Sequence, residues 1–233
     1  MRRVGWSIIL ALALAGCGGD ATAPEGSPSA RAAEADASAL PVMGPERRIL
    51  AFGDSLFAGF QLGDGESYPA VLEAALRARG IDARVTNAGV SGDTTAAGRQ
   101  RLAFVLGQEQ RTPDLAIVEL GGNDLLRGIP PAETRRNLAA ILAELKTRDI
   151  PVLLMGMRAP PNLGADFVAA FDGLYPALAE EYGAALVPFF LASVYDQPAL
   201  IQPDRIHPTA EGVEALVAAT VNEVVEALPE TDS

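Results

Sequence analysis

Short apolar runs alternate with helical patterns between residues 47 and 228. Each run predicts a buried strand, and between the runs apolar side chains recur at the spacing of one helix face. Strands that alternate with helices predict an α/β fold, here a three-layer α/β/α sandwich around a five-stranded parallel sheet. The expected strands span residues 49–52, 83–86, 115–120, 152–155 and 185–187. The expected helices span residues 68–79, 95–106, 131–148, 166–182 (with a bend near Pro176) and 210–228.

The strand order does not follow from periodicity, but the flavodoxin-like order is the usual one for five parallel strands. In such sheets, ligands bind beyond the carboxyl ends of the strands. Polar or glycine-rich segments follow four of the expected strands. They are residues 53–56, 87–94, 121–124 and, further along the chain, 204–207. We therefore expect these segments to converge at one edge of the sheet.

Composition excludes several classes of function. The chain has 233 residues, with 18 basic and 30 acidic side chains and a formal net charge of −12. An acidic chain is a poor partner for nucleic acid, because that affinity comes from Lys and Arg. One Cys and one His cannot build a Cys/His zinc site. We expect no metal, no cofactor and no nucleic-acid partner.

The only histidine, His207, is the only possible imidazole base. Asp204 precedes it by three residues, so that its carboxylate can accept a hydrogen bond from Nδ1 and leave Nε2 free to take a proton from Ser55. Ser55 alone would be read as an ordinary helix cap. Together the three residues predict a nucleophile, a base and an orienting carboxylate. We expect the neighbouring Asp54 to hold the serine loop.

These segments resemble the four motif blocks of the SGNH (GDSL) hydrolase superfamily. Ser55 stands in the serine block, Gly92 in the glycine block, Asn123 in the GxND block, and Asp204 with His207 in the DxxH block. The resemblance implies a serine hydrolase that works through an acyl-enzyme. It also implies that the backbone N–H groups of Ser55 and Gly92 and the amide of Asn123 form the oxyanion hole.

Two further segments, residues 91–94 and 159–164, are similar to the branch of bacterial arylesterases and acyl-CoA thioesterases/lysophospholipases. This similarity implies hydrolysis of carboxylic esters or thioesters, such as aryl esters, acyl-CoA or lysophospholipids. An O-acetylesterase acting on envelope polysaccharide and a lipoprotein that binds acyl ligands without hydrolysing them are alternatives. The side chains expected to line an apolar substrate pocket are Leu56, Phe57, Met157, Pro160, Pro161 and Phe189.

Other nucleophile and nucleotide motifs are missing from the sequence. An α/β-hydrolase would carry its serine in G-x-S-x-G. A dinucleotide-binding or P-loop module would carry G-x-G-x-x-G or G-x-x-x-x-G-K-[ST]. None of the three patterns occurs, so the serine blocks described above are the chemistry that the sequence offers.

The first residues have the pattern of a targeting segment. Two arginines precede an uncharged stretch, residues 4–16, that is too short to span a bilayer and is typical of a signal peptide. It ends in Leu14-Ala15-Gly16-Cys17, which resembles the lipobox of bacterial lipoproteins. Residues 1–16 would then be removed, and Cys17 would carry acyl chains. An A-x-A-like cleavage site at residues 13–15 and a thiol without function are the alternatives.

Residues 17–46 are rich in small and polar side chains, which is typical of a disordered linker. We expect this linker to tether a single hydrolase domain, residues 47–233, to a bacterial envelope membrane, facing the periplasm. Gly18 follows the cysteine where an Asp signals inner-membrane retention in some bacteria, which favours the outer membrane. We expect a monomer that reaches the membrane only through Cys17.

Overall fold

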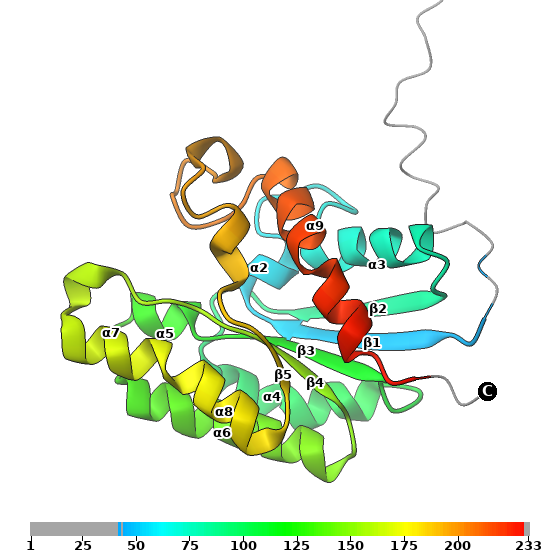
Figure 1. The fold of residues 1–233 in the computed structure, drawn as a ribbon, viewed down its shortest axis with the longest axis horizontal. Helices are drawn as coiled ribbons and strands as arrows, with labels where there is room; N and C mark the ends of the chain where they lie inside the picture. The colour runs from blue at the N-terminus through cyan, green and yellow to red at the C-terminus, as the bar shows by residue number, and fades with distance from the viewer. Residues whose placement is uncertain (1–41, 43, 231–233) are drawn as a thin grey trace, which may run out of the picture.

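The computed structural model describes residue 42 and residues 44–230; residues 1–41, 43 and 231–233 lie outside the described part. Its centre is a parallel five-stranded sheet in the order β2-β1-β3-β4-β5 (Figure 1). This is the flavodoxin-like order, so the predicted fold class is confirmed. The strands are β1 (Arg47–Gly53), β2 (Ala83–Gly89), β3 (Leu115–Glu119), β4 (Val152–Met155) and β5 (Ala185–Val187).

Helices cover both faces of the sheet, as the connections between parallel strands require. One face carries α3 (Tyr68–Ala78) and α9 (Ala210–Ala227), which pack against each other (Figure 1). The other face carries α4 (Thr95–Gln108), α6 (Pro131–Thr147), α7 (Ala165–Asp172) and α8 (Leu174–Tyr182). The remaining short elements are α2 (Ser55–Ala58), α5 (Gly122–Leu126), η2 (Pro161–Leu163), η3 (Phe190–Ser193) and η4 (Pro198–Leu200).

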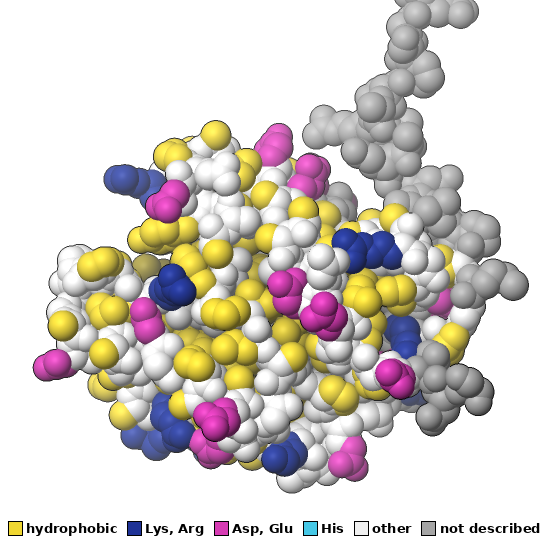
Figure 2. All heavy atoms as spheres, viewed as in Figure 1, with side chains coloured by type: hydrophobic (Ala, Val, Ile, Leu, Met, Phe, Trp, Pro, Cys, Tyr) yellow, Lys and Arg dark blue, Asp and Glu magenta, His cyan; other side chains and the backbone are white. Residues whose placement is uncertain are grey.

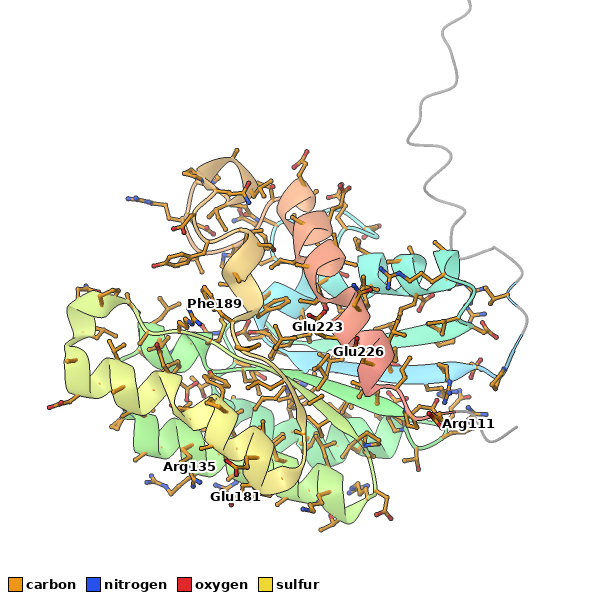
Figure 3. The ribbon with its side chains drawn as sticks, in the orientation of Figure 1. Arg111, Arg135, Glu181, Phe189, Glu223 and Glu226 are labelled. Atoms are coloured by element: carbon orange, nitrogen blue, oxygen red, sulfur yellow. The ribbon has the colours of Figure 1, made fainter. Side chains whose placement is uncertain are left out.

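The middle of the sheet forms the core. Every residue of β3 is buried, and so are the last five residues of β1. The surface is charged and mixed: Figure 2 shows acidic and basic side chains scattered over one face rather than gathered by sign. One such pair joins neighbouring helices, with Arg135 of α6 and Glu181 of α8 at 2.6 Å (Figure 3). No helix of the described residues is long and apolar enough to cross a membrane.

The strand register aligns the carboxyl ends of the central strands. Gly53 of β1 lies opposite Gly89 of β2 and Glu119 of β3, and Glu119 lies opposite Met155 of β4. The strand order switches at β1: β2 is added on one side of β1, and β3 and the later strands are added on the other. The segments after these strands therefore meet at the switch point, where open α/β sheets bind ligands.

Three details differ from the expected elements. The predicted helix over residues 166–182 is two helices that meet at Gly173, not one helix bent at Pro176. Pro176 lies in the first turn of α8, where the backbone N–H has no partner within the helix and its loss costs nothing. The short helices α2 and α5 also replace segments expected to be loops. The signal peptide, the linker and Cys17 fall outside the described residues.

Candidate active site

Ser55 is the first residue of α2 and is 8% exposed. The Asp54 carboxylate caps this helix by accepting a hydrogen bond from the backbone N–H of Leu56 at 3.1 Å. Gly89 lets β2 approach α2 closely, because a Cβ there would lie 2.7 Å from the carbonyl carbon of Phe57. Strand end and cap together hold Ser55 at the carboxyl edge of the sheet, as the sequence predicted for the serine loop.

Asp204 and His207 lie in one tight turn. The Oδ1 atom of Asp204 accepts hydrogen bonds from the backbone N–H groups of Ile206 at 2.9 Å and His207 at 3.0 Å. Its Oδ2 atom lies 2.6 Å from Nδ1 of the His207 ring. Arg205 adopts a φ of 64° within this turn. A single carboxylate therefore both folds the turn and orients the imidazole.

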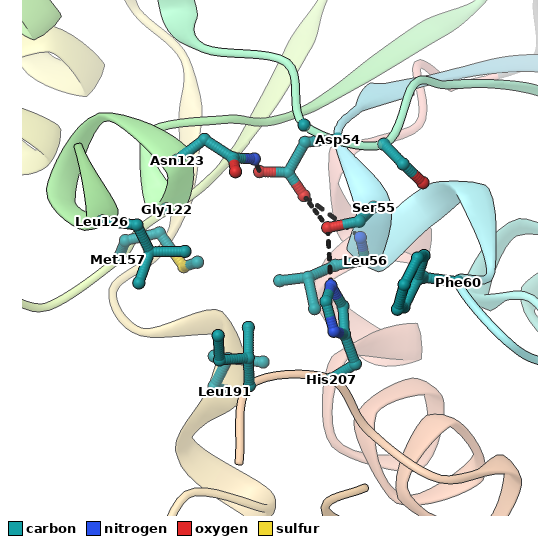
Figure 4. Close-up of a pocket in the computed structure, with 13 residues that line it drawn as sticks. Asp54, Ser55, Leu56, Phe60, Gly122, Asn123, Leu126, Met157, Leu191 and His207 are labelled. Atoms are coloured by element: carbon teal, nitrogen blue, oxygen red, sulfur yellow. Dashed lines mark hydrogen bonds between the residues drawn. The ribbon is translucent and has the colours of Figure 1, made fainter. Parts of the chain in front are cut away.

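The turn brings His207 to Ser55 across 152 positions of sequence. The distance from His207 Nε2 to Ser55 Oγ is 2.9 Å (Figure 4). Partial burial raises the pKa of Asp204, but hydrogen bonds from the His207 ring and from two backbone N–H groups outweigh it and lower that pKa to about 2. Asp204 is thus charged at neutral pH and stabilises a protonated imidazole. The arrangement has the hydrogen-bond geometry of a serine–histidine–aspartate triad.

The three expected oxyanion donors line the same cavity as Ser55 and His207. The backbone N–H of Ser55 belongs to the first turn of α2, where N–H groups have no partner within the helix. Gly92 adopts a φ of 85°, a conformation that favours glycine, and its carbonyl accepts a hydrogen bond from Arg127 at 2.7 Å. Asn123 lies in the first turn of α5 and points into the cavity (Figure 4).

The buried carboxyl groups of Asp54 and Glu119 hold the segment around Ser55 through hydrogen bonds. Asp54 accepts a hydrogen bond from the Asn123 side-chain amide at 2.9 Å (Figure 4), and Glu119 accepts one from the Asp54 backbone N–H at 3.4 Å. Burial and the neighbouring Asp54 charge raise the pKa of Glu119 well above its ordinary value. Burial also raises the pKa of Asp54, although hydrogen bonds from Leu56, Glu119 and Asn123 oppose the rise. Burial thus acts on both carboxyl groups, and the pKa of Glu119 is raised further because the Asp54 carboxylate lies beside it.

The cavity has a volume of about 200 Å³ and is mostly apolar. Of the side chains expected to line it, Leu56 and Met157 do so. Phe57 instead lies in the core, stacked on Tyr68 with ring centroids 5.0 Å apart. Phe189 is not among the residues that line the cavity; it lies after β5 (Figure 3), against Tyr195. Four further apolar residues line the cavity and were not expected from the sequence: Phe60, Leu126, Leu191 and Ile206.

Pro160 and Pro161 also lie away from the cavity, where η2 begins, and both are exposed. The sequence offered no signal for the four missed residues, because each belongs to a loop or a short helix whose position depends on the tertiary fold. Among residues 44–230 no group of three or more His, Cys, Asp or Glu side chains could hold a metal ion.

Comparisons with known proteins point to one family. The profile of the GDSL-like Lipase/Acylhydrolase family matches residues 51–215. An arylesterase of Vibrio mimicus is 39% identical over 181 residues, which is 78% of this chain and 90% of the relative. The thioesterase 1/protease 1/lysophospholipase L1 of Escherichia coli K12 is 40% identical over 163 residues, covering 70% and 76% of the two chains.

A solved structure is also similar. The SGNH-hydrolase family esterase AlinE4 is 68% identical, and the match covers 81% of this chain and all of that one with a TM-score of 0.68. The Ser55, Gly92, Asn123 and Asp204/His207 segments all lie at one edge of a sheet of the same architecture. The chain belongs to the GDSL-like lipase/acylhydrolase family.

Proposed function

We propose that this chain is a serine esterase that hydrolyses carboxylic esters and thioesters through an acyl-enzyme. The observation that carries the proposal is the continuous contact from Asp204 through His207 to Ser55, with distances of 2.6 Å and 2.9 Å. Relatives named arylesterase, esterase and thioesterase at 39–68% identity support the reaction class. A serine esterase needs neither metal nor cofactor for this chemistry.

Acylation begins with attack of Ser55 Oγ on the carbonyl carbon of the ester. His207 Nε2 takes the Oγ proton, and the charged Asp204 stabilises the imidazolium that results. The C–O or C–S bond of the leaving group then breaks, and His207 returns the proton to that group. A water molecule then attacks the acyl carbon, and His207 takes its proton. The bond to Ser55 Oγ breaks, the acid is released, and His207 returns the proton to Ser55.

The oxyanion of each tetrahedral intermediate needs donors that are already in place, because reorganising them would cost part of the rate enhancement. We assign this role to the backbone N–H groups of Ser55 and Gly92 and to the amide of Asn123. All three residues line the cavity into which Ser55 points. The apolar side chains around them, including Leu56 and Met157, favour an ester with an apolar acyl group over an acetylated polysaccharide.

Variants of a relative add support. Structures of esterase AlinE4 have been solved with a serine replaced by alanine and with an aspartate replaced by alanine. Those two positions are as far apart in that chain as Ser55 and Asp204 are in this one. The assignment of a nucleophile and an orienting carboxylate to Ser55 and Asp204 rests partly on this correspondence.

The function can be tested by trapping the nucleophile. A fluorophosphonate probe should label the wild-type protein and not Ser55→Ala, and hydrolysis of p-nitrophenyl butyrate should fall by about 10⁴-fold or more in that variant. Ser67→Ala, which removes a hydroxyl with no capping hydrogen bond, is a matched control. Labelling that persists in Ser55→Ala would exclude Ser55 as the nucleophile. Comparison with palmitoyl-CoA and an acetylated glycan would rank the substrate classes.

We further propose that Cys17 is lipidated and tethers a monomeric enzyme to the envelope, facing the periplasm and favouring the outer membrane. The motif Leu14-Ala15-Gly16-Cys17 and the uncharged stretch before it support this placement. Cys17→Ser should move the protein from the membrane fraction to the soluble fraction. A variant that stays with the membrane would contradict the anchor, and sedimentation of residues 46–233 would test the monomer.

A further inference from the structure

The turn that carries Asp204 and His207 is closed at its base by the side chain of Gln202. Gln202 is 9% exposed, and its Nε2 donates hydrogen bonds to the carbonyl of Phe60 at 3.0 Å and to that of Pro208 at 2.8 Å. Its backbone N–H donates to the His207 carbonyl at 2.7 Å. Both protons of the side-chain amide are therefore used inside the protein.

The two carbonyls that Gln202 binds belong to different halves of the site. Phe60 follows the short helix that begins at Ser55, while Pro208 follows His207 directly. The hydrogen bond to Phe60 spans 142 positions of sequence. One buried amide thus joins the segment that carries Ser55 to the turn that carries His207.

A ring contact runs beside this link. The Phe60 ring lies against the His207 imidazole, with centroids 4.4 Å apart and planes inclined by 36°. Gln202 holds the backbone of Phe60, and the Phe60 ring in turn contacts the imidazole. Backbone and ring together restrict the position of His207 relative to Ser55.

This restriction bears on the rate because proton transfer depends on a short, aligned contact between Ser55 Oγ and His207 Nε2. A displacement of about 1 Å at a reacting centre can cost about 10²-fold in rate. The turn from Asp204 to His207 is otherwise mostly exposed, so few other contacts fix its distance from the serine loop.

We propose that Gln202 is a positioning residue: by linking the segment after Ser55 to the turn that carries His207, it sets the distance between Ser55 and His207. The inference rests on the proposed function, since it assigns Gln202 a part in the same reaction. A residue that only stabilises the fold would change the melting temperature and leave kcat of the folded protein unchanged. A positioning residue also lowers kcat at temperatures where the protein is folded.

The test replaces the amide by an apolar side chain of similar length. In Gln202→Met we expect kcat for p-nitrophenyl butyrate to fall at least 10-fold while KM changes less than twofold. The rate constant of fluorophosphonate labelling should fall by the same factor, because it depends on the same proton transfer. The matched control is Gln197→Met, which removes a similar amide-to-carbonyl bond, from Gln197 Nε2 to the Ser193 carbonyl, and should leave both rates unchanged.

Melting temperature separates the two roles. A Gln202→Met protein that melts earlier but keeps the wild-type kcat and labelling rate at a temperature where it is folded would overturn the proposal. If Gln202→Met does not fold, Gln202→Asn serves instead, because it keeps the amide but withdraws it by one methylene. Unchanged rates in Gln202→Asn would also overturn the proposal. Wild-type protein that neither hydrolyses esters nor reacts with the probe would contradict the proposed function instead.

Discussion

The side-chain amide of Asn123 donates a hydrogen bond to the Asp54 carboxylate at 2.9 Å. The Asp54 oxygen accepts in this contact, so the nitrogen end of the Asn123 amide faces Asp54. One amide proton is held by Asp54, and the other remains for the oxygen of a bound ester. Asp54, expected from the sequence only to hold the serine loop, also orients the side chain that we propose as an oxyanion donor.

Asp54→Asn should therefore lower kcat while the fold is kept. Asn is as good a helix cap as Asp, so α2 should remain in place. The new amide can turn its own N–H groups toward Asn123 and so lose the single orientation of that side chain. We expect a fall in kcat of about 10-fold or more, since loss of one oxyanion donor costs 10²–10³. Asp64→Asn, an exposed change of the same kind, should have wild-type kinetics; an active Asp54→Asn would contradict the orienting role.

Asn123→Ala removes the amide itself. We expect kcat to fall about 10²–10³-fold, which corresponds to about 2.7–4 kcal/mol of transition-state stabilisation. KM should change little, because the donor binds the transition state more strongly than the ester. Steady-state kinetics would measure both, with Asn222→Ala as the control because Asn222 is exposed and accepts a hydrogen bond from Arg79 on the surface. A loss confined to KM would mean that Asn123 binds substrate rather than the oxyanion.

Asp204→Asn should lower the rate sharply. The pKa of Asp204 is about 2, so in the wild type this carboxylate is charged at neutral pH and stabilises the imidazolium that forms in the reaction. Asn removes that charge and can also hold the wrong tautomer of the ring, so kcat/KM at neutral pH should fall by about 10⁴-fold. Steady-state kinetics would measure the loss. A variant with wild-type kcat/KM would show that Asp204 does not act on His207.

Leu126 should matter only for apolar acyl groups. It lies at the mouth of the cavity and is 63% exposed (Figure 4). Apolar contact contributes about 25 cal/mol per Å², so covering part of one leucine with an acyl chain is worth on the order of 1 kcal/mol. In Leu126→Ser, kcat/KM for butyrate or hexanoate esters should fall roughly fivefold and that for acetate esters should not. Phe104→Ser, 70% exposed and outside the cavity, is the control; equal losses for all chain lengths would refute the contact.

Sequence patterns predicted the parts of the fold that depend on period. A buried strand appears in the sequence as a continuous apolar run, and an amphipathic helix appears as apolar residues spaced three or four positions apart. The positions of these elements could therefore be read from the spacing of apolar residues. That the strands run parallel followed from the alternation of strands and helices. The meeting of Ser55, Gly92, Asn123 and His207 could be expected, because each follows a strand whose end lies at the same edge.

The remaining features could not be predicted, because they depend on tertiary contacts that leave no periodic pattern in the sequence. The helix α2 has only four residues, and Asp54 caps it. This short helix places Phe57 in the core and Leu56 in the wall of the cavity. The cavity is lined by Leu126, at the end of α5, and by Ile206, in a loop, and only the tertiary fold brings the two together. Likewise, α7 and α8 meet at Gly173 and not at the more conspicuous Pro176.

His207 is the only histidine of the whole chain, and both of its ring nitrogens are engaged at the site. A proton NMR spectrum of this protein therefore contains one set of imidazole resonances and needs neither isotope labelling nor assignment. The proton between Nδ1 and Asp204, at 2.6 Å, should resonate far downfield without overlap from a second ring. This enzyme reports the ionisation of its own base through a single signal.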